Sequence, residues 1–259
     1  MLRWLILILT LARPLHAEPV EVDLELVLAV DVSRSMTPLE LEIQRRGYAE
    51  ALTSDEVWTA IRGGMIGRVA LTYMEWAGQF HQRVVVPWTL IETREDAARF
   101  AAAITAHFDG SMRRTSISGG LEAATIAFEI NDFHGLRRVI DISGDGPNNH
   151  GRPVLPARSE VLAKGIIING LPLMTEDEMS RRFGIPDLDA YYTNCVIGGP
   201  GAFMLPVWSW EDFEPTLRRK LVLELAGIEP QPQIIPVAGY DCMIGEKLWE
   251  QYFGDWYSP

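Results

Sequence analysis

The sequence predicts an α/β fold, with a doubly wound, mostly parallel six-stranded sheet, one antiparallel edge strand and helices on both faces. Strand-like and helix-like segments alternate along almost the whole chain, which is typical of this class. The clearest strand candidate, Leu26–Val30, is an unbroken apolar run, as expected for a strand buried on both faces. Only residues 77–81 separate two other strand candidates, which is too short for a crossover, so these two should pair antiparallel.

The elements can be placed in order from their boundary signals. A strand at 22–30 leads to a helix at 38–52, where Thr37, Pro38 and Glu40 provide a hydroxyl cap, a first-position proline and an acid. The remaining elements are expected as a helix at 55–62, strands at 67–76 and 82–88, helices at 94–107 and 118–130, a strand at 138–142, a helix at 154–164, a strand at 166–169, a helix at 176–183, a strand at 202–207 and a helix at 210–226.

The chain divides into three parts. Residues 1–17 have a basic start, the apolar run Leu5–Ala12 and a final small residue, Ala17, which is the layout of a secretory signal peptide. A membrane anchor is the alternative, although the run is shorter than the ~20 residues that a span needs. Residues 18–226 form the α/β domain, and 227–259 look like an extended tail packed on it. We expect a periplasmic or secreted protein with no membrane span.

Charge and cysteine content narrow the function classes. The formal net charge is −12, and such an acidic surface repels nucleic acid and anionic membranes, so we expect neither as a partner. The two cysteines, Cys195 and Cys242, are expected to form a disulfide in an exported protein and to tie the tail to the domain. Two buried free thiols are the alternative, and a zinc site is disfavoured because no histidines stand at ligand spacing.

Polar residues gather in three loops where strands or helices meet the expected ligand-binding edge of the sheet. Asp31, Ser33 and Ser35 follow the strongest strand, and alternate residues of an extended loop project the same way. Thr115 precedes a small-residue-rich helix, and Asp145 follows another strand. Carboxylates and hydroxyls are ligands for hard cations, so the five residues predict a site for Mg²⁺, or for Mn²⁺ or Ca²⁺. Without a metal, they would be a helix cap and ordinary turn residues.

Here the chain resembles the von Willebrand factor A family, whose metal-ion-dependent adhesion site combines an Asp-x-Ser-x-Ser motif with a later Thr and a later Asp. It is most similar to the proteobacterial exported branch, which is catalogued as a domain of unknown function. The resemblance implies that Ser33 and Ser35 coordinate directly, that Thr115 does so in the open form, and that Asp31 and Asp145 act through water. It also implies a protein partner that presents an acidic side chain to the metal.

The resemblance covers residues 24–226 and has two departures. The family often reads Thr-Asp-Gly in the third loop, whereas this chain has Ser-Gly-Asp-Gly at 143–146. Arg113 and Arg114 stand where small residues are usual, and they either pair with carboxylates of a partner or offset the acidic surface. Asp141 lies within a strand and is either a group near the site or a buried carboxylate with a partner.

Three functions are compatible with these residues. The first is an exported, cation-dependent protein-binding module of the adhesion type. The second is a metal-assisted hydrolase, which is disfavoured because the chain has no Gly-x-Ser-x-Gly, P-loop, His-Glu-x-x-His or Asp-x-Asp motif. The third is a structural exported protein in which the metal only stabilises the fold. We therefore expect a protein that is not an enzyme.

Overall fold

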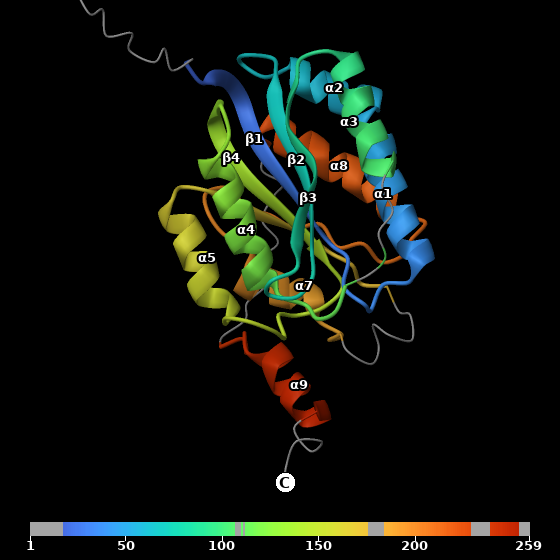
Figure 1. The fold of residues 1–259 in the computed structure, drawn as a ribbon, viewed down its shortest axis with the longest axis vertical. Helices are drawn as coiled ribbons and strands as arrows, with labels where there is room; N and C mark the ends of the chain where they lie inside the picture. Colours follow the sequence, from blue (N-terminus) through green and yellow to red (C-terminus); the bar gives the residue numbers. More distant parts are fainter. Residues whose placement is uncertain (1–17, 107–109, 111, 176–183, 229–238, 254–259) are drawn as a thin grey trace, which may run out of the picture.

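The computed structural model shows an α/β protein with one sheet between two layers of helices (Figure 1). It describes residues 18–106, 110, 112–175, 184–228 and 239–253. The strands lie in the order β3-β2-β1-β4-β5, all parallel except the β2–β3 pair. The fold class predicted from the sequence, including the antiparallel edge strand, is confirmed. The strands are β1 (Val20–Asp31), β2 (Val69–Trp76), β3 (Gln82–Ile91), β4 (Phe133–Gly144) and β5 (Ile167–Pro172).

The helices connect these strands and cover both faces of the sheet. They are α1 (Pro38–Leu52), α2 (Asp55–Arg62), α3 (Arg94–Ala106), α4 (Ile117–Glu129), α5 (Val154–Ala163), α7 (Leu188–Tyr191), the π-helical turn η1 (Tyr192–Val196), α8 (Phe213–Ala226) and α9 (Ile244–Phe253). Helices α1, α2, α3 and α8 lie on one side of the sheet, and α4 and α5 lie on the other (Figure 1).

Strand β1 is the centre of the core because it is buried on both faces. Leu26 and Leu28 belong to the hydrophobic cluster under α1 and α8, whereas Val27 and Ala29 belong to the cluster under α4 and α5. All four side chains are inaccessible to solvent. The unbroken apolar run in the sequence is explained by this two-sided burial.

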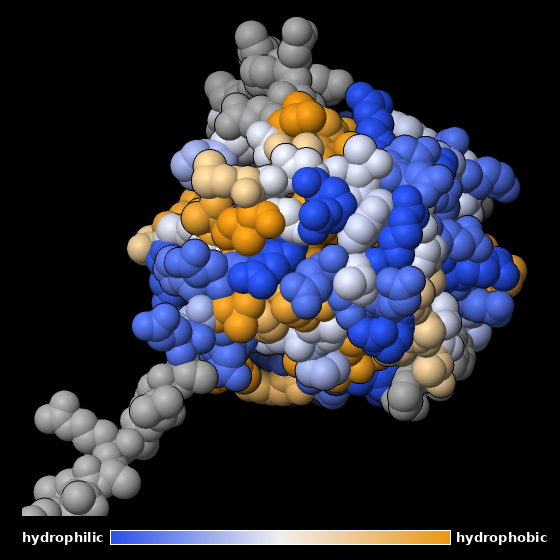
Figure 2. Space-filling model, turned by 90° about the horizontal axis from the view of Figure 1, so that it is seen from above, coloured by the Kyte–Doolittle hydropathy of each residue, from blue (hydrophilic) through white to orange (hydrophobic). Residues whose placement is uncertain are grey.

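The surface differs from this core in composition. At the end of the molecule opposite α9, hydrophilic residues predominate and hydrophobic ones occur in separate groups between them (Figure 2). Loops at the α9 end follow the carboxyl ends of the parallel strands, where ligand sites gather in open α/β sheets.

The sixth strand predicted at 202–207 is not a continuous strand, and this part of the prediction was wrong. Met204 and Val207 form only isolated parallel bridges to Gly170 and Leu173. The same register places Pro206 opposite a second proline at the end of β5. Neither proline has an N–H to donate, so the hydrogen-bonded ladder is interrupted there.

The tail also differs from the extended chain that the sequence suggested, because residues 244–253 form helix α9. The structure joins Cys195, in the π-helical turn, to Cys242 by a disulfide with a Cα–Cα distance of 5.5 Å. The bond fixes the chain just before α9 to the domain. The signal peptide predicted at 1–17 and the helix predicted at 176–183 lie outside the described residues.

A buried charged cluster connects the sheet to α8. The Lys220 ammonium lies 2.5 Å from the Asp141 carboxylate of β4 and 2.5 Å from that of Glu224, and all three side chains are buried. Asn169 of β5 donates to the same Glu224 oxygen at 2.8 Å. Asp141 is therefore a buried carboxylate with a partner, which was one of the two interpretations open from the sequence.

Candidate metal centre

The first loop of the candidate site begins at the last residue of β1. Asp31 is completely buried, and its Oδ1 accepts a hydrogen bond of 2.7 Å from the backbone N–H of Ser33. The hydroxyl oxygens of Ser33 and Ser35 lie 2.9 Å apart. Thr37 then begins α1 in a capping box with Glu40, which fixes where the loop ends. The structure thus brings the three oxygen-bearing residues of the sequence motif together.

The second carboxylate oxygen of Asp31 has an unusual environment. Asp31 Oδ2 is buried and has no hydrogen-bond donor among the described residues. A Cβ placed on Gly144 would lie 3.0 Å from this oxygen and 2.9 Å from the hydroxyl of Tyr192. Glycine at position 144 therefore keeps open the space beside Asp31 Oδ2. A buried acceptor without a donor is unfavourable, and a cation bound there would offset that penalty.

The third loop brings the second carboxylate of the site to the first. Asp145 is buried, with 6% of its surface exposed. Burial, and after it the negative charge of Asp145, raises the pKa of Asp31 well above its usual value. The polar surroundings that Ser33 and the backbone of Asp145 give the Asp31 carboxyl oppose this increase in its pKa. Two buried carboxylates close enough to repel each other form an environment that attracts a cation.

The second loop carries Thr115 and is attached to both of the others. The N–H of Met112 donates to the carbonyl of Val32 at 2.8 Å, which pairs the second loop with the first. The Thr115 N–H donates to Asn149 Oδ1 at 3.1 Å, and the Asn149 N–H returns a bond of 3.0 Å to the Thr115 carbonyl. Within the described residues, no hydrogen bond joins the Thr115 hydroxyl to the other four site residues.

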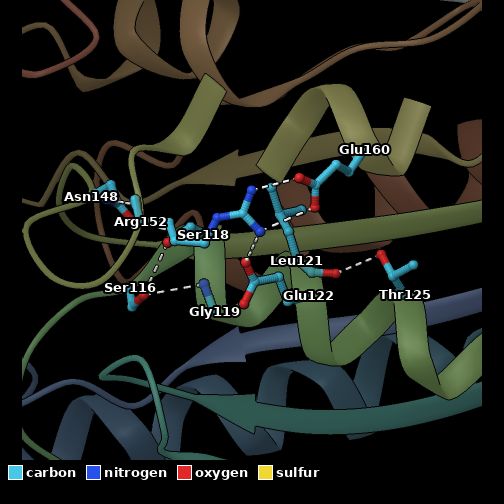
Figure 3. Close-up of polar contacts among 9 residues, drawn as sticks. All are labelled: Ser116, Ser118, Gly119, Leu121, Glu122, Thr125, Asn148, Arg152 and Glu160. Carbon is cyan, nitrogen blue, oxygen red and sulfur yellow. Dashed lines mark hydrogen bonds and ion pairs between the residues drawn. The ribbon is translucent and has the colours of Figure 1, made fainter. Parts of the chain in front are cut away.

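Helix α4 begins immediately after Thr115 and is fastened to the third loop (Figure 3). Ser116 caps the helix by accepting from Gly119 N–H at 3.1 Å, and Ser118 N–H donates to Asn148 Oδ1 at 3.1 Å. Arg152, farther along the third loop, pairs with Glu122 of α4 and with Glu160 of α5. These bonds hold the loops of Thr115 and Asp145 in a fixed relation.

Two residues around the site, Tyr192 and Gln44, could not be identified from the sequence. Tyr192, in the π-helical turn, has a buried hydroxyl with no hydrogen-bond partner in the described chain. Burial, and after it the charges of Asp31 and Asp145, raises the pKa of this phenol well above its usual value. Gln44 of α1 donates to the Asp31 carbonyl at 3.0 Å. Neither residue belongs to a motif, and only the fold places them here.

The donor set fits a hard divalent cation. The five candidate residues supply two carboxylates and three hydroxyls, all oxygen ligands of the kind that Mg²⁺ and Ca²⁺ take. No group of three or more His, Cys, Asp or Glu side chains suited to a metal occurs in the described chain. The two acids balance the formal charge of a divalent cation, and the three hydroxyls add oxygen ligands without further negative charge.

Comparison with known proteins places the chain in a family. Residues 21–229 match the family described as "Protein of unknown function (DUF1194)". The chain belongs to this family. No curated protein matches it.

Solved structures show that this DUF1194 protein shares the von Willebrand factor A fold. Proximal thread matrix protein 1 from the mussel byssus, solved with a zinc-occupied MIDAS motif, has a TM-score of 0.59 and 16% identity over 81% of this chain and 49% of its own. The pilus adhesin SpaC from Lactobacillus rhamnosus GG has a TM-score of 0.55 and 13% identity, over 81% and 30%. A von Willebrand factor type A protein from Catenulispora acidiphila has a TM-score of 0.53 and 11% identity, over 79% and 43%. This chain spans less than half the length of each.

Proposed function

We propose that this protein is an exported, divalent-cation-dependent protein-binding module of the adhesion type. In this proposal Asp31, Ser33, Ser35, Thr115 and Asp145 hold the cation, with Mg²⁺ the first candidate and Mn²⁺ or Ca²⁺ the alternatives. The bound cation supplies the positive charge that holds an acidic side chain of the partner. The three hydroxyls contribute neutral oxygens, so the cation keeps more of its positive charge than it would among carboxylates alone.

One observation carries the proposal, namely the buried Asp31 Oδ2 that lacks a donor in the described chain. The oxygen lies beside Gly144, where a side chain would fill the space. The Asp145 carboxylate nearby raises the pKa of Asp31, so a cation would relieve both the missing donor and the repulsion. Solved structures of the same fold support the binding role, since they include a pilus adhesin and a matrix protein with zinc in its MIDAS motif.

Export is the second part of the proposal. The signal-like segment 1–17 favours a periplasmic or secreted location. The disulfide between Cys195 and Cys242 is also typical of an oxidising compartment. In the part of the chain that the structure describes, no helix has the length and apolar character needed to span a bilayer.

A pull-down from the native exported fraction tests the binding role. The bait is the full chain in Mg²⁺, in excess EDTA, and as the variant Asp31→Ala in Mg²⁺. The matched control is Asp55→Ala, which removes an exposed aspartate of α2. We expect a partner that is captured by the native chain and by Asp55→Ala in Mg²⁺ and is lost in the other two samples. Capture that persists unchanged in EDTA would rule out a metal bridge.

A metal that only stabilises the fold is the second candidate, because burial of two repelling carboxylates favours it as well. Thermal unfolding in Mg²⁺ and in EDTA separates the two. A melting temperature that rises with Mg²⁺, together with no cation-dependent capture, assigns the metal to stability alone.

A further inference from the structure

Two exposed arginines, Arg34 and Arg113, follow directly after the bridge that joins the first and second loops of the candidate metal centre. Ser33 and Met112 form a parallel bridge between the first and second loops, supported by the Met112 N–H bond to Val32. Arg34 and Arg113 are the residues that follow this bridged pair in the first and second loops. Both arginines are exposed, whereas Ser33 is buried, so the guanidinium groups are accessible to a partner beside the candidate site.

These arginines lack an ion-pair partner among the described residues, as do the exposed Arg62 and Arg219, but here three such residues lie together beside one site. Neither Arg34, Arg113 nor the adjacent Arg114 forms an ion pair with any carboxylate of the described chain. Six other arginines that reach the surface do form such pairs: Arg46, Arg68, Arg94, Arg99, Arg152 and Arg218. The first and second loops of the candidate metal centre therefore carry three guanidinium groups whose charge no carboxylate of the described chain compensates.

Among the described residues, this arrangement of positive charges is unfavourable. Like charges that are brought near each other repel. The chain has 35 acidic and 23 basic residues, so a neighbouring carboxylate would be the common outcome for a surface arginine. Arg114 also has a left-handed backbone, with φ of 75°, which a non-glycine residue rarely adopts. A cost that is concentrated beside a binding site indicates a role in binding.

Helix α9 contacts the guanidinium group of Arg114. The Arg114 guanidinium stacks 3.8 Å from the ring centroid of Trp249. Glu246, one turn earlier, accepts from Asn148 Nδ2 at 2.7 Å, so α9 is attached to the third loop as well. Stacking uses the face of the guanidinium and leaves its N–H edges available to an acceptor.

We infer that Arg34, Arg113 and Arg114 form a second anion subsite beside the metal centre, and that the partner is an acidic peptide segment with at least two carboxylates. One carboxylate binds the cation, and another binds the guanidinium groups through charge-assisted hydrogen bonds. A short acidic segment fits better than a long polyanion, because the net charge of −12 repels a polyanion outside this edge. The inference rests on the proposed function.

Fluorescence anisotropy with two labelled peptides tests the subsite. One is a 12-residue Gly/Ser peptide with a single central Glu, and the other has three Glu at alternate central positions. Both are titrated with the full chain in Mg²⁺ and in EDTA. The variant is the pair Arg34→Gln and Arg113→Gln, and the control is Arg219→Gln, an exposed arginine of α8 outside the three loops.

The subsite predicts tighter binding of the three-Glu peptide by the native chain and by Arg219→Gln. The double variant should bind that peptide roughly three- to thirtyfold more weakly, while its affinity for the one-Glu peptide changes little. Its melting temperature should stay equal or rise, because two repelling charges are gone, whereas a structural role predicts a fall.

Three results would overturn the inference. The first is equal affinity of the native chain for both peptides, and the second is no binding of the three-Glu peptide in Mg²⁺. The third is a double variant that prefers the three-Glu peptide over the one-Glu peptide as strongly as the native chain does. Heparin serves as a long polyanion. The inference would also be contradicted if the native chain bound heparin more tightly than the three-Glu peptide and this binding depended on Arg34 and Arg113. If EDTA does not weaken peptide binding but the native chain still binds the three-Glu peptide more tightly than the one-Glu peptide, the metal bridge is refuted and the arginine subsite stands.

Discussion

Replacing Lys220 with methionine removes the ammonium group that pairs with two buried carboxylates, those of Asp141 and Glu224. Asp141 and Glu224 each lie 2.5 Å from the Lys220 Nζ, and all three side chains are inaccessible to solvent. Removing one member of a buried ion pair costs about 3–5 kcal/mol, because the charge left behind is desolvated and unpaired. In a domain of this size such a loss lowers the melting temperature by about 6–20 °C.

The chain offers a matched control in Lys164, which forms an exposed ion pair with Glu129. Lys164→Met should cost less than about 1 kcal/mol, because solvent screens an exposed pair. Urea unfolding of the native chain and both variants at one pH gives the two free energies of unfolding. A loss for Lys220→Met no larger than that for Lys164→Met would show that the buried cluster does not connect β4 to α8 as described.

The pH dependence provides a second readout of the same cluster. Burial, and after it the charge of Asp141, raises the pKa of Glu224 from 4.5 to about 7. The folded pKa is therefore above the unfolded one, and the stability that the protonated form provides is lost as the pH rises from 4.5 through about 7. Lys220 lowers the pKa of both carboxyl groups, so its removal should destabilise the protein less at pH 5 than at pH 8.

Two further predictions concern the third loop and the tail. Gly144→Ala should weaken Mg²⁺ binding, measured by calorimetry, about tenfold or more, because its Cβ would enter the space beside the Asp31 carboxylate. Gly146→Ala is the control, because a Cβ there meets open space and should leave the affinity unchanged. Equal affinities of the two variants would contradict this account of the loop. Replacing Cys195 and Cys242 with alanine should lower the free energy of unfolding by about 2–4 kcal/mol and increase hydrogen exchange in α9, and unchanged exchange would show that the helix is held by other contacts.

The sequence was sufficient for the elements whose signals are local. The capping box at Thr37 and the apolar run of β1 predicted α1 and the central strand because caps and two-sided burial leave direct marks in sequence. The interrupted sixth strand could not be predicted, because Pro206 weakens pairing only through the residue that faces it. Helix α9 was missed because the prolines before it suggested extended chain for the whole tail.

Within the candidate site, the motif identifies candidate residues but not their surroundings. Asp31, Ser33 and Ser35 are close in sequence, so their proximity followed from the loop alone. Tyr192 lies far along the chain, and its approach to Asp31 depends on a π-helical turn with no signal in the sequence. The bridge between Ser33 and Met112, which Arg34 and Arg113 follow, likewise depends on two loops that meet only in the folded protein.

Isothermal titration of Mg²⁺ into the metal-free full chain tests the central claim most directly. The same titration is run with Asp31→Asn, which keeps the size of the side chain, and with Asp55→Asn as the control for an exposed aspartate. We predict binding of one Mg²⁺ by the native chain and by Asp55→Asn, and an affinity at least about tenfold weaker for Asp31→Asn. Equal affinity in all three proteins, or no binding by the native chain of Mg²⁺, Mn²⁺ or Ca²⁺, would contradict a metal centre at the end of β1.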